Sequence, residues 1–252
     1  MREIRIFSAL PLSAQSGLTL GSGPSRHISQ VLRMQPGQEL VLFDGSGGEY
    51  SARIEHCGRN KVAVRVGEHK PDERESPLEL HLLHGLCRSE RMDSVVQKAT
   101  ELGVTTIRPI LTARSVIKLN AARAEKKRLH WQNVAISACE QSGRNRIPEI
   151  LAPLPFAAAL KLDRGNGTAQ TLAIMLDPSG TNSLGDYAGV NNAVGLWTGP
   201  EGGFTADEVS QAKQAGFKIT QAGPRILRTE TAPIVALSIL QLLAGDLGVT
   251  RN

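Results

Sequence analysis

The C-terminal part of the chain contains the same unit twice, an apolar strand followed by a glycine-rich turn and a helix. Val194 to Thr198 leads into Gly199-Pro200-Glu201-Gly202-Gly203, and Phe217 to Gln221 leads into the turn from Gly223 to Thr231. Strands that run in the same direction need a returning connection, and a helix commonly provides it. This repetition therefore predicts an α/β protein with a parallel sheet.

The limits of the two C-terminal helices can be set from local signals. Thr205 and Glu208 have the spacing of a capping box, in which each side chain binds a free backbone N–H of the first turn. Pro233 has no N–H to donate and belongs in the first turn of the last helix. Thr231 is therefore predicted to cap that helix, and Arg228 to Glu230 are predicted to stay in the loop.

The same rhythm of strands and helices extends upstream to about residue 78. The predicted strands and helices, in chain order, are Leu78 to Leu86 (strand), Glu90 to Leu102 (helix), Val104 to Ile110 (strand), Asn120 to Ser142 (helix) and Leu172 to Leu176 (strand). Gly103 and Gly143 are natural C-terminal caps for the two helices, and Asn120 is an N-terminal cap for the second.

The first 70 or so residues have a different pattern, which is rich in short strands. The predicted strands are 38–43, 49–55 and 61–66, with Tyr50, Ala52 and Ile54 on one face of the second. A single helical pattern covers residues 26–34. Short strands with one helix indicate a small β-barrel, and the polar, proline-bracketed stretch 69–77 indicates a boundary. We therefore predict two domains, residues 1–72 and 73–252.

Composition restricts the class of protein. The chain has 252 residues, of which 40% are hydrophobic, enough for a sizeable core, but it has no apolar run long enough for a membrane span. The N-terminal residues lack the apolar region of a signal peptide. Cys57, Cys87 and Cys139 form no CxxC pair and are typical of reduced thiols. We expect a cytoplasmic protein without a membrane partner.

Positive charge is concentrated in one segment. The formal net charge is +5, and the stretch from Arg114 to Arg146 contains eight basic and two acidic residues. The basic residues are Arg114, Lys118, Arg123, Lys126, Lys127, Arg128, Arg144 and Arg146. Such a segment attracts a phosphate backbone, because neutralised phosphates release counterions. A solvated helix face is the alternative explanation of the same charges.

The two glycine-rich turns are the candidate ligand site. In open α/β sheets ligands bind in the crevice at the carboxyl ends of neighbouring strands, and glycines let backbone N–H groups approach them. The turns contain neither GxGxxG nor GxxxxGK[ST], so a dinucleotide oxidoreductase and a P-loop protein are disfavoured. Tight turns with packing glycines remain the alternative. His81 and His84 have HxxH spacing but no further ligands nearby in the sequence, so we expect no metal site.

Several motifs together resemble one enzyme family. Gly199-Pro200-Glu201-Gly202-Gly203-Phe204, paired with Leu227-Arg228-Thr229-Glu230-Thr231-Ala232, is similar to the bacterial 16S rRNA (uracil-N3)-methyltransferases of the SPOUT class. The segments 91–93, 97–104 and 140–148 also resemble that family, as do His27, Val31 to Met34 and Pro36-Gly37 in the first domain. The resemblance covers nearly the whole chain.

This resemblance implies a SPOUT-type parallel sheet with a C-terminal trefoil knot, preceded by a PUA-like RNA-binding β-barrel. It implies S-adenosylmethionine (SAM) as cofactor, a homodimer, and 16S rRNA of the small ribosomal subunit as partner, methylated at a uridine N3 in the decoding region. The expected cofactor-binding residues are Leu176, Leu196, Thr198, Gly199, Pro200, Glu201, Gly202, Gly203, Gly223, Ile226, Leu227, Arg228, Thr231 and Ala232.

Methylation at N3 requires that a proton leaves and that negative charge on the uracil is stabilised. We expect Glu201 or Glu230 to accept the proton and an arginine among Arg228, Arg225 and Arg144 to stabilise the charge, since arginine stays protonated. The expected RNA-binding residues are Arg26, Arg33, Arg114, Arg144 and Arg146. A SPOUT methyltransferase for another RNA site, or a non-catalytic RNA-binding ribosome-assembly factor, are the competing functions. Trp131 and Trp197 are expected to be packed in the core rather than to stack on bases.

Overall fold

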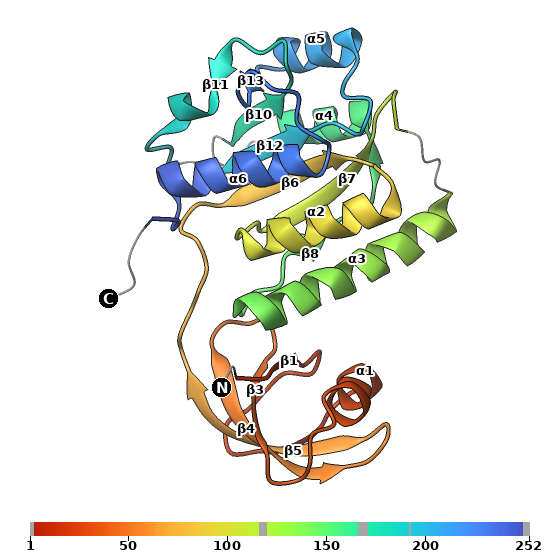
Figure 1. Cartoon of the computed structure of the whole chain (residues 1–252), viewed down its shortest axis with the longest axis vertical. Coiled ribbons are helices and arrows are strands. Elements are labelled where there is room, and N and C mark those ends of the chain that lie inside the picture. Colours follow the sequence, from red (N-terminus) through yellow and green to blue (C-terminus); the bar gives the residue numbers. More distant parts are fainter. Residues whose placement is uncertain (1–2, 116–119, 166–170, 192, 249–252) are drawn as a thin grey trace. The chain divides into compact units, whose positions relative to one another are not determined.

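The computed structural model describes residues 3–115, 120–165, 171–191 and 193–248 (Figure 1). Lys118 of the basic segment lies outside the described residues. The chain divides into two compact units. The first contains Met1–Glu75 together with Ile136–Ile147, and the second contains Ser76–Ala135 and Pro148–Asn252. No sequence pattern indicated that residues 136–147 would join the first unit.

The first unit contains a five-stranded sheet in the order β1-β3-β4-β5-β2. Its strands are β1 (Arg5–Phe7), β2 (Gly17–Thr19), β3 (Glu39–Phe43), β4 (Glu49–Cys57) and β5 (Val62–Lys70). The three predicted strands correspond to β3, β4 and β5. In β4, Ala52 and Ile54 are buried and Tyr50 packs against the same cluster, as their spacing predicted. The strands β1 and β2 have three residues each, too few for a periodic pattern to be recognised.

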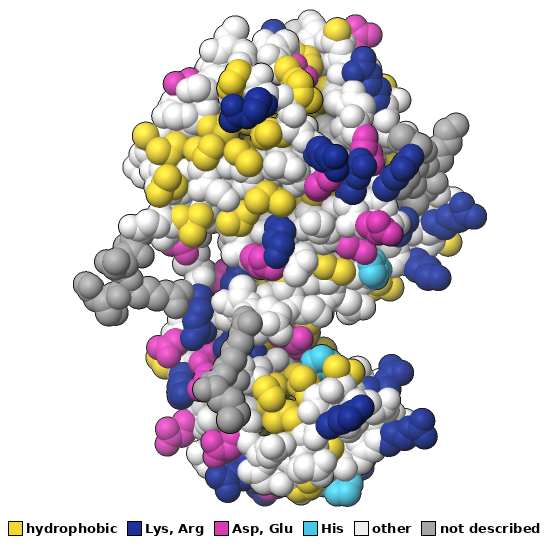
Figure 2. Space-filling view, viewed as in Figure 1, with side chains coloured by type: hydrophobic (Ala, Val, Ile, Leu, Met, Phe, Trp, Pro, Cys, Tyr) yellow, Lys and Arg dark blue, Asp and Glu magenta, His cyan; other side chains and the backbone are white. Residues whose placement is uncertain are grey.

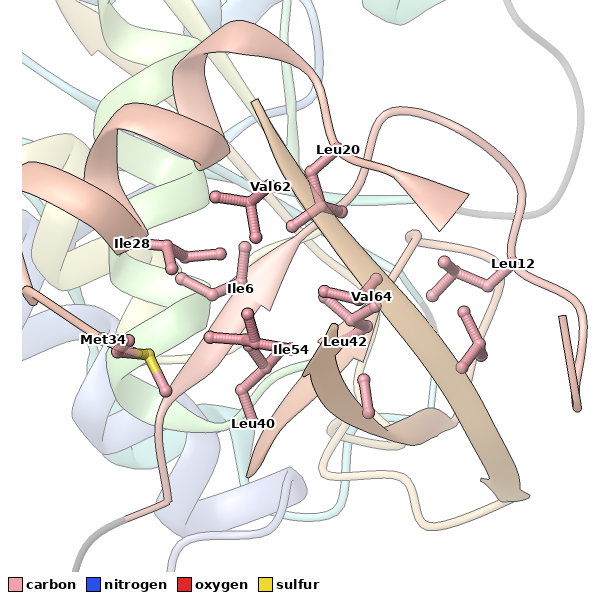
Figure 3. Close-up of a cluster of buried hydrophobic side chains, with 12 residues drawn as sticks. Ile6, Leu12, Leu20, Ile28, Met34, Leu40, Leu42, Ile54, Val62 and Val64 are labelled. Carbon is pink, nitrogen blue, oxygen red and sulfur yellow. The ribbon is translucent and has the colours of Figure 1, made fainter. Parts of the chain in front are cut away.

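A short helical segment covers the core of this unit. It consists of the α-helix α1 (Ser22–Arg26) and a π-helical turn, η1 (His27–Val31). The helix was predicted over 26–34 but begins and ends earlier. Its end is set by Arg33, whose φ of +53° is not helical. Ile28 points from this segment toward Ile6, Ile54 and Val62, so that helix and strands share one core (Figure 3).

Residues 136–147 are fixed to the first unit by polar contacts. The Phe7 N–H donates to Glu140 Oε1 at 3.0 Å, and Arg5 Nη2 donates to Asn145 Oδ1 at 2.6 Å. Arg74 donates to the Gly143 carbonyl at 2.9 Å. Arg5 and Arg74 also pair with the same buried carboxylate, that of Glu49. These contacts join segments that are up to 140 residues apart in the sequence.

The second unit is built on an eight-stranded sheet in the order β11-β13-β10-β12-β6-β7-β8, with β9 also paired to β7. Every strand pairing described in it is parallel, which confirms the α/β prediction. The strands are β6 (Leu80–Gly85), β7 (Thr106–Leu111), β8 (Glu149–Ile150), β9 (Leu154–Pro155), β10 (Leu172–Leu176), β11 (Asn182–Ser183), β12 (Val194–Thr198) and β13 (Lys218–Gln221).

Helices cover this sheet. They are α2 (Ser89–Glu101), α3 (Ala121–Ser142), whose last turns belong to the first unit, α4 (Phe156–Gly165), the 3₁₀ turn η2 (Leu184–Tyr187), α5 (Ala206–Gln214) and α6 (Thr231–Ala244). α2 and α6 lie side by side on one face (Figure 1). α4 and α5 share a hydrophobic cluster with Met175, Trp197 and Ile219 of the sheet.

Local signals fixed most helix ends correctly. Asn120 Oδ1 accepts from the Arg123 N–H at 2.9 Å, and the Thr205–Glu208 capping box is formed. The prediction that Thr231 caps α6 was wrong, because Thr231 is the first helical residue and Glu230 precedes it without a side-chain cap. The Arg228 carbonyl accepts from the N–H groups of Thr231 (2.9 Å) and Ala232 (3.0 Å), so a capping side chain is not needed.

Both tryptophans are fully buried, as predicted. Trp131 Nε1 donates to Asp93 Oδ1 at 3.0 Å. His81 binds the Thr106 hydroxyl (2.9 Å), and among the described residues no group of three or more His, Cys, Asp or Glu could hold a metal ion. No helix in the described parts of the chain is long and apolar enough to cross a membrane.

Candidate cofactor and active site

A cavity of about 740 Å³ lies at the carboxyl ends of β10, β12 and β13 in the second unit. The two glycine-rich turns supply most of its wall. They are residues 199–204 after β12 and residues 222–229 after β13. A third loop, Asp177-Pro178 after β10, also lines it. The crevice rule that singled out two strand ends therefore applies to three neighbouring ones.

The loop after β12 passes very close to the strand beside it. A Cβ atom on Gly85, the last residue of β6, would lie 2.3 Å from Pro200 N, so a side chain there would displace the loop. Gly203 and Gly223 have positive φ angles (+67° and +87°), which glycine adopts without strain, and the space beside each is open. These glycines keep the backbone of both loops accessible from the cavity.

Arg91 joins the two glycine-rich loops through their acidic residues. Its guanidinium lies 3.3 Å from Glu201 Oε1 and 3.8 Å from Glu230 Oε2. The Arg88 N–H also donates to Glu201 Oε1 at 3.2 Å. Burial alone would raise the pKa of Glu201, but the backbone hydrogen bonds from Glu201 and Arg88 and the charges of Arg91 and Arg88 outweigh it and lower that pKa. Glu230 Oε2 is buried and accepts no hydrogen bond from any described residue.

Arg114 stabilises the loop after β12 by binding its carbonyl groups. Its Nη1 donates to the carbonyls of Gly202 (2.8 Å) and Phe204 (3.2 Å). Glu208, the predicted capping-box residue, has a second role here, since its carboxylate accepts from the Ala113 N–H at 2.9 Å. The loop after β7 and the loop after β12 are therefore bound to each other by two independent sets of hydrogen bonds.

The remaining basic residues of the cavity are Arg225 and Arg228. Both are exposed, and neither forms an ion pair with any acidic residue in the described ranges. Thr229, which follows Arg228 and precedes α6, is buried. Its hydroxyl donates to the Gly199 carbonyl at 2.8 Å. That bond ties the second loop to the first and leaves the two guanidiniums at the cavity.

A buried polar pair supports the strands beneath the cavity. His84 Nδ1 lies 2.7 Å from the Thr198 hydroxyl, and burial lowers the pKa of His84 to about 4, so its ring is neutral at pH 7. Cys87 lies 3.6 Å from the other ring nitrogen. Burial, and then the charges of Glu201 and Glu230, raise the pKa of Cys87 to about 12. The contact between His84 and Thr198 links β6 to β12.

Most predicted cofactor residues line the cavity, but three do not. Leu196 and Thr198 are buried within β12, and Thr231 begins α6 outside the lining, whereas Ala232 belongs to it. The lining residues that sequence reasoning missed are Arg91, Asp177, Pro178, Phe204, Gln221, Ala222, Pro224 and Thr229. The turn pattern Asp177-Pro178-Ser179-Gly180 after an apolar strand was a signal for the third loop.

The predicted RNA-binding residues fall into different settings. Arg114 lines the cavity, as described above. Arg26 and Arg33 are exposed in the first unit. Arg144, predicted for catalysis as well, is buried in that unit with its Nη2 at 2.5 Å from Glu75 Oε2, and Arg146 lies 3.5 Å from Glu73.

Two family models match the chain. Residues 74–241 match the model described as RNA methyltransferase domain, and residues 25–67 match the model described as RNA methyltransferase PUA domain. The first match contains every residue that lines the cavity.

Relatives and solved structures agree with these matches. A ribosomal RNA small subunit methyltransferase E from Buchnera aphidicola is 34% identical, over 96% of this chain and 97% of the relative. The protein of that name from Bacillus subtilis is 32% identical, over 87% and 89%. The Neisseria gonorrhoeae one, solved with S-adenosylmethionine, is 34% identical with a TM-score of 0.89, over 98% and 100%. A Legionella pneumophila structure with bound SAM is 38% identical with a TM-score of 0.93, over the same shares.

Proposed function

The chain belongs to the RNA methyltransferase family whose members include the small subunit methyltransferases E, and we propose that it transfers a methyl group from SAM to N3 of a uridine in the decoding region of 16S rRNA. The observation that carries this proposal is the cavity between the two paired motifs. The same loops that resemble the uracil-N3 methyltransferases converge on one cavity, at the sheet edge where α/β proteins bind their ligands.

The residues of the cavity fit SAM. Its volume is in the range of small-molecule sites, and the open glycines Gly203 and Gly223 offer backbone groups to a ligand. SAM carries charges of both signs, and the lining supplies both, from Asp177 and Glu201 and from the arginines. The loops after β10, β12 and β13 would hold it. When bound, SAM supplies a methyl group on a sulfonium, which a nucleophile attacks in line.

We propose that Glu230, rather than Glu201, accepts the proton that leaves N3. Glu201 is held by the Arg88 N–H and by Arg91, and its lowered pKa makes it a weak base. Glu230 lies outside the cavity lining, but its buried Oε2 accepts no hydrogen bond among the described residues, which leaves one acceptor for a proton that arrives through water. Arg91 holds both carboxylates in place, 3.3 and 3.8 Å away, and is a positioning residue.

Arg228 and Arg225 are proposed to stabilise the negative charge that develops on the uracil carbonyls. Their guanidiniums are at the cavity and have no carboxylate partner among the described residues, so they remain available to the substrate. A preorganised donor of this kind contributes about 100- to 1,000-fold to a rate. Arg144, which is ion-paired with Glu75 in the first unit, is proposed to organise that unit instead.

Helix α6 supports the proposal of a homodimer. It has no charged residue over its 14 positions. Leu242 is 62% exposed, and Val235, Ile239 and Leu243 are half-buried, although the opposite side of the helix is already packed. Hydrophobic side chains gather on the surface over α6 (Figure 2). A second copy of the chain would cover this apolar side.

The finer features of the fold are part of the same proposal. We propose that residues 1–72 form a PUA-like RNA-binding barrel and that residues 73–252 form a SPOUT domain with a trefoil knot. The knot is supported by the path of loop 222–229, which is bound to Gly199 through Thr229 before α6 packs on α2. We propose a cytoplasmic location, because the proposed substrate is ribosomal.

The proposal can be tested with small ribosomal subunits from cells that lack this protein. Purified enzyme and SAM are added, and the rRNA is digested and analysed by mass spectrometry. The expected product is 3-methyluridine in a decoding-region fragment. A methyl group at another atom or site, or no methylation by an enzyme that binds SAM, would contradict it.

A further inference from the structure

The segment that connects β6 to α2 follows the loop after β12 over several residues. Gly85, the last residue of β6, is so close to Pro200 that a side chain on it would displace the loop. Further along, the Arg88 N–H and the Arg91 guanidinium both bind Glu201. The two segments therefore lie side by side, and the first limits the conformations that the loop can adopt.

His84 and Thr198 lie where this contact begins. They are the last pair in the register of β6 with β12, and the next residue of the chain, Gly199, leaves the sheet. The two residues are 0% and 1% exposed, and His84 Nδ1 lies 2.7 Å from the Thr198 hydroxyl oxygen. Burial of an imidazole or a hydroxyl costs free energy unless the group is hydrogen-bonded, so each of these side chains depends on the other.

The ring of His84 has a contact at both nitrogens. Its Nε2 lies 3.6 Å from the sulfur of Cys87, which is also buried. The neutral ring has one nitrogen that donates and one that accepts. A rotation of the ring would break both contacts, so Thr198 is bonded to a group whose orientation is fixed.

Gly199, the first residue of the loop, is held from two directions. Its carbonyl accepts from the Thr229 hydroxyl at 2.8 Å, and the residue before it is bonded to His84. A Cβ atom on Gly199 would lie 3.0 Å from the Gly203 Cα, so the loop closes tightly on its first residue. A change in the direction of the Thr198–Gly199 peptide would therefore move the part of the loop that lines the cavity.

We propose that His84 and Thr198 are a positioning pair for the cofactor, which holds the start of the loop after β12 in the conformation that binds SAM. Neither residue lines the cavity, so both act through the loop and not by contact with the ligand. The inference rests on the proposed function only for the identity of the cofactor. It does not depend on which RNA atom is methylated.

Strand β6 contains a second pair of the same chemistry, which provides a control. His81 Nδ1 lies 2.9 Å from the Thr106 hydroxyl and links β6 to β7. This pair lies near the amino ends of the two strands, and neither residue belongs to the cavity lining. Loss of either threonine hydroxyl removes one histidine–threonine hydrogen bond from the same sheet, but only Thr198 adjoins the loop.

The test compares Thr198→Val with Thr106→Val, two changes that each replace a hydroxyl by a methyl group. SAM binding to each purified variant is measured by calorimetry, and the free energy of unfolding is measured by urea denaturation. Hydrogen exchange of residues 199–203 without SAM reports on the loop itself. Thr198→Ser keeps the hydroxyl and is the rescue variant.

Thr198→Val should bind SAM about tenfold more weakly than wild type, and residues 199–203 should exchange faster. Thr106→Val also loses a hydrogen bond of the sheet, but it should keep the wild-type SAM affinity and loop exchange, as should Thr198→Ser. Equal losses of SAM affinity in the two valine variants, or an unchanged affinity in Thr198→Val, would overturn the proposal.

A double variant separates positioning from stability. Thr198→Val alone leaves His84 buried without its partner, which destabilises the sheet. His84→Leu with Thr198→Val replaces both polar groups, and such a replacement is often nearly neutral for stability. The double variant should show the same loss of SAM affinity, and wild-type affinity in it would contradict the positioning role. A failure of the proposed function is seen separately, as a methyl group at another atom or site in the wild-type reaction.

Discussion

Arg5, Arg74 and Arg144 of the first unit each reach a glutamate, whereas three of the four arginines that line the cavity reach no carboxylate among the described residues. Arg5 and Arg74 share the buried Glu49, and Arg144 is buried against Glu75. At the cavity, Arg114 binds carbonyls, and Arg225 and Arg228 remain exposed. A buried charge must be compensated or it destabilises the fold. An uncompensated charge at a cavity is available to a ligand.

The strongest way to break this contrast is to remove the shared carboxylate of the first unit. Glu49→Ala leaves Arg5 buried without its acid, and we expect a loss of about 3–5 kcal/mol in the free energy of unfolding of that unit. Both tryptophans lie in the second unit, so hydrogen exchange of the β4 amides is the suitable measurement. The control is Glu39→Ala, which removes an exposed partner of Arg53 and should cost no more than about 1 kcal/mol. Similar losses of stability in both variants would refute the distinction between the buried and the exposed ion pair.

The converse test removes an unpaired charge at the cavity. Arg228→Ala should lower kcat about 100- to 1,000-fold, because charge on the uracil would lose its donor. The free energy of unfolding and the Kd for SAM should stay near wild type, as measured by denaturation and calorimetry. Lys213→Ala on α5 is the matched exposed control. Arg228→Ala enzyme that turns over normally would rule out this role.

Arg91 combines the two settings, because it lines the cavity and is also paired with glutamates. Arg91→Met removes the cation between Glu201 and Glu230, and we expect SAM affinity to fall about tenfold, or about 1.4 kcal/mol. The pKa of Glu201 should rise because Arg91 contributes to lowering it. The decline of SAM affinity on acidification should therefore begin at a higher pH than in wild type. Arg91→Lys should restore part of the affinity for SAM. Calorimetry across pH is the measurement. A loss of SAM affinity in Arg91→Met without the change in its pH dependence would indicate a purely structural role.

The smallest expected effect is the pH dependence of the first unit. Burial would raise the pKa of Glu49, but the hydrogen bonds and charges of Arg5 and Arg74 outweigh it, and its pKa lies below the ordinary value of 4.5. Its contribution to stability is therefore complete above pH 4.5 and is lost as the pH falls below it. Hydrogen exchange of β4 between pH 3 and 6 should show this loss, and Glu49→Gln should remove it. A wild-type curve that is flat below pH 4.5 would contradict the assignment.

Local features of this fold were predictable, and long-range polar contacts were not. The capping box at Thr205, the glycines that end α2 and α3, and the strands β10 and β12 follow from residues within a few positions of one another. Arg91 could not be assigned, because its partner Glu201 is 110 residues away and no sequence period relates them. The failed cap at Thr231 is a local exception, since the carbonyl of Arg228, three residues earlier, took the place of the expected side chain.

The division of α3 between the two units has a consequence for synthesis on the ribosome. The N-terminal 75 residues leave the exit tunnel first, yet Arg5 finds its partner Asn145, and Arg74 its partner Gly143, only after residue 145 has been made. Domains commonly fold from the N-terminus as they emerge. Here the first unit must wait while about a third of the second is translated. A nascent chain halted near residue 75 should therefore remain open to proteolysis, and one halted well beyond residue 147 should be protected.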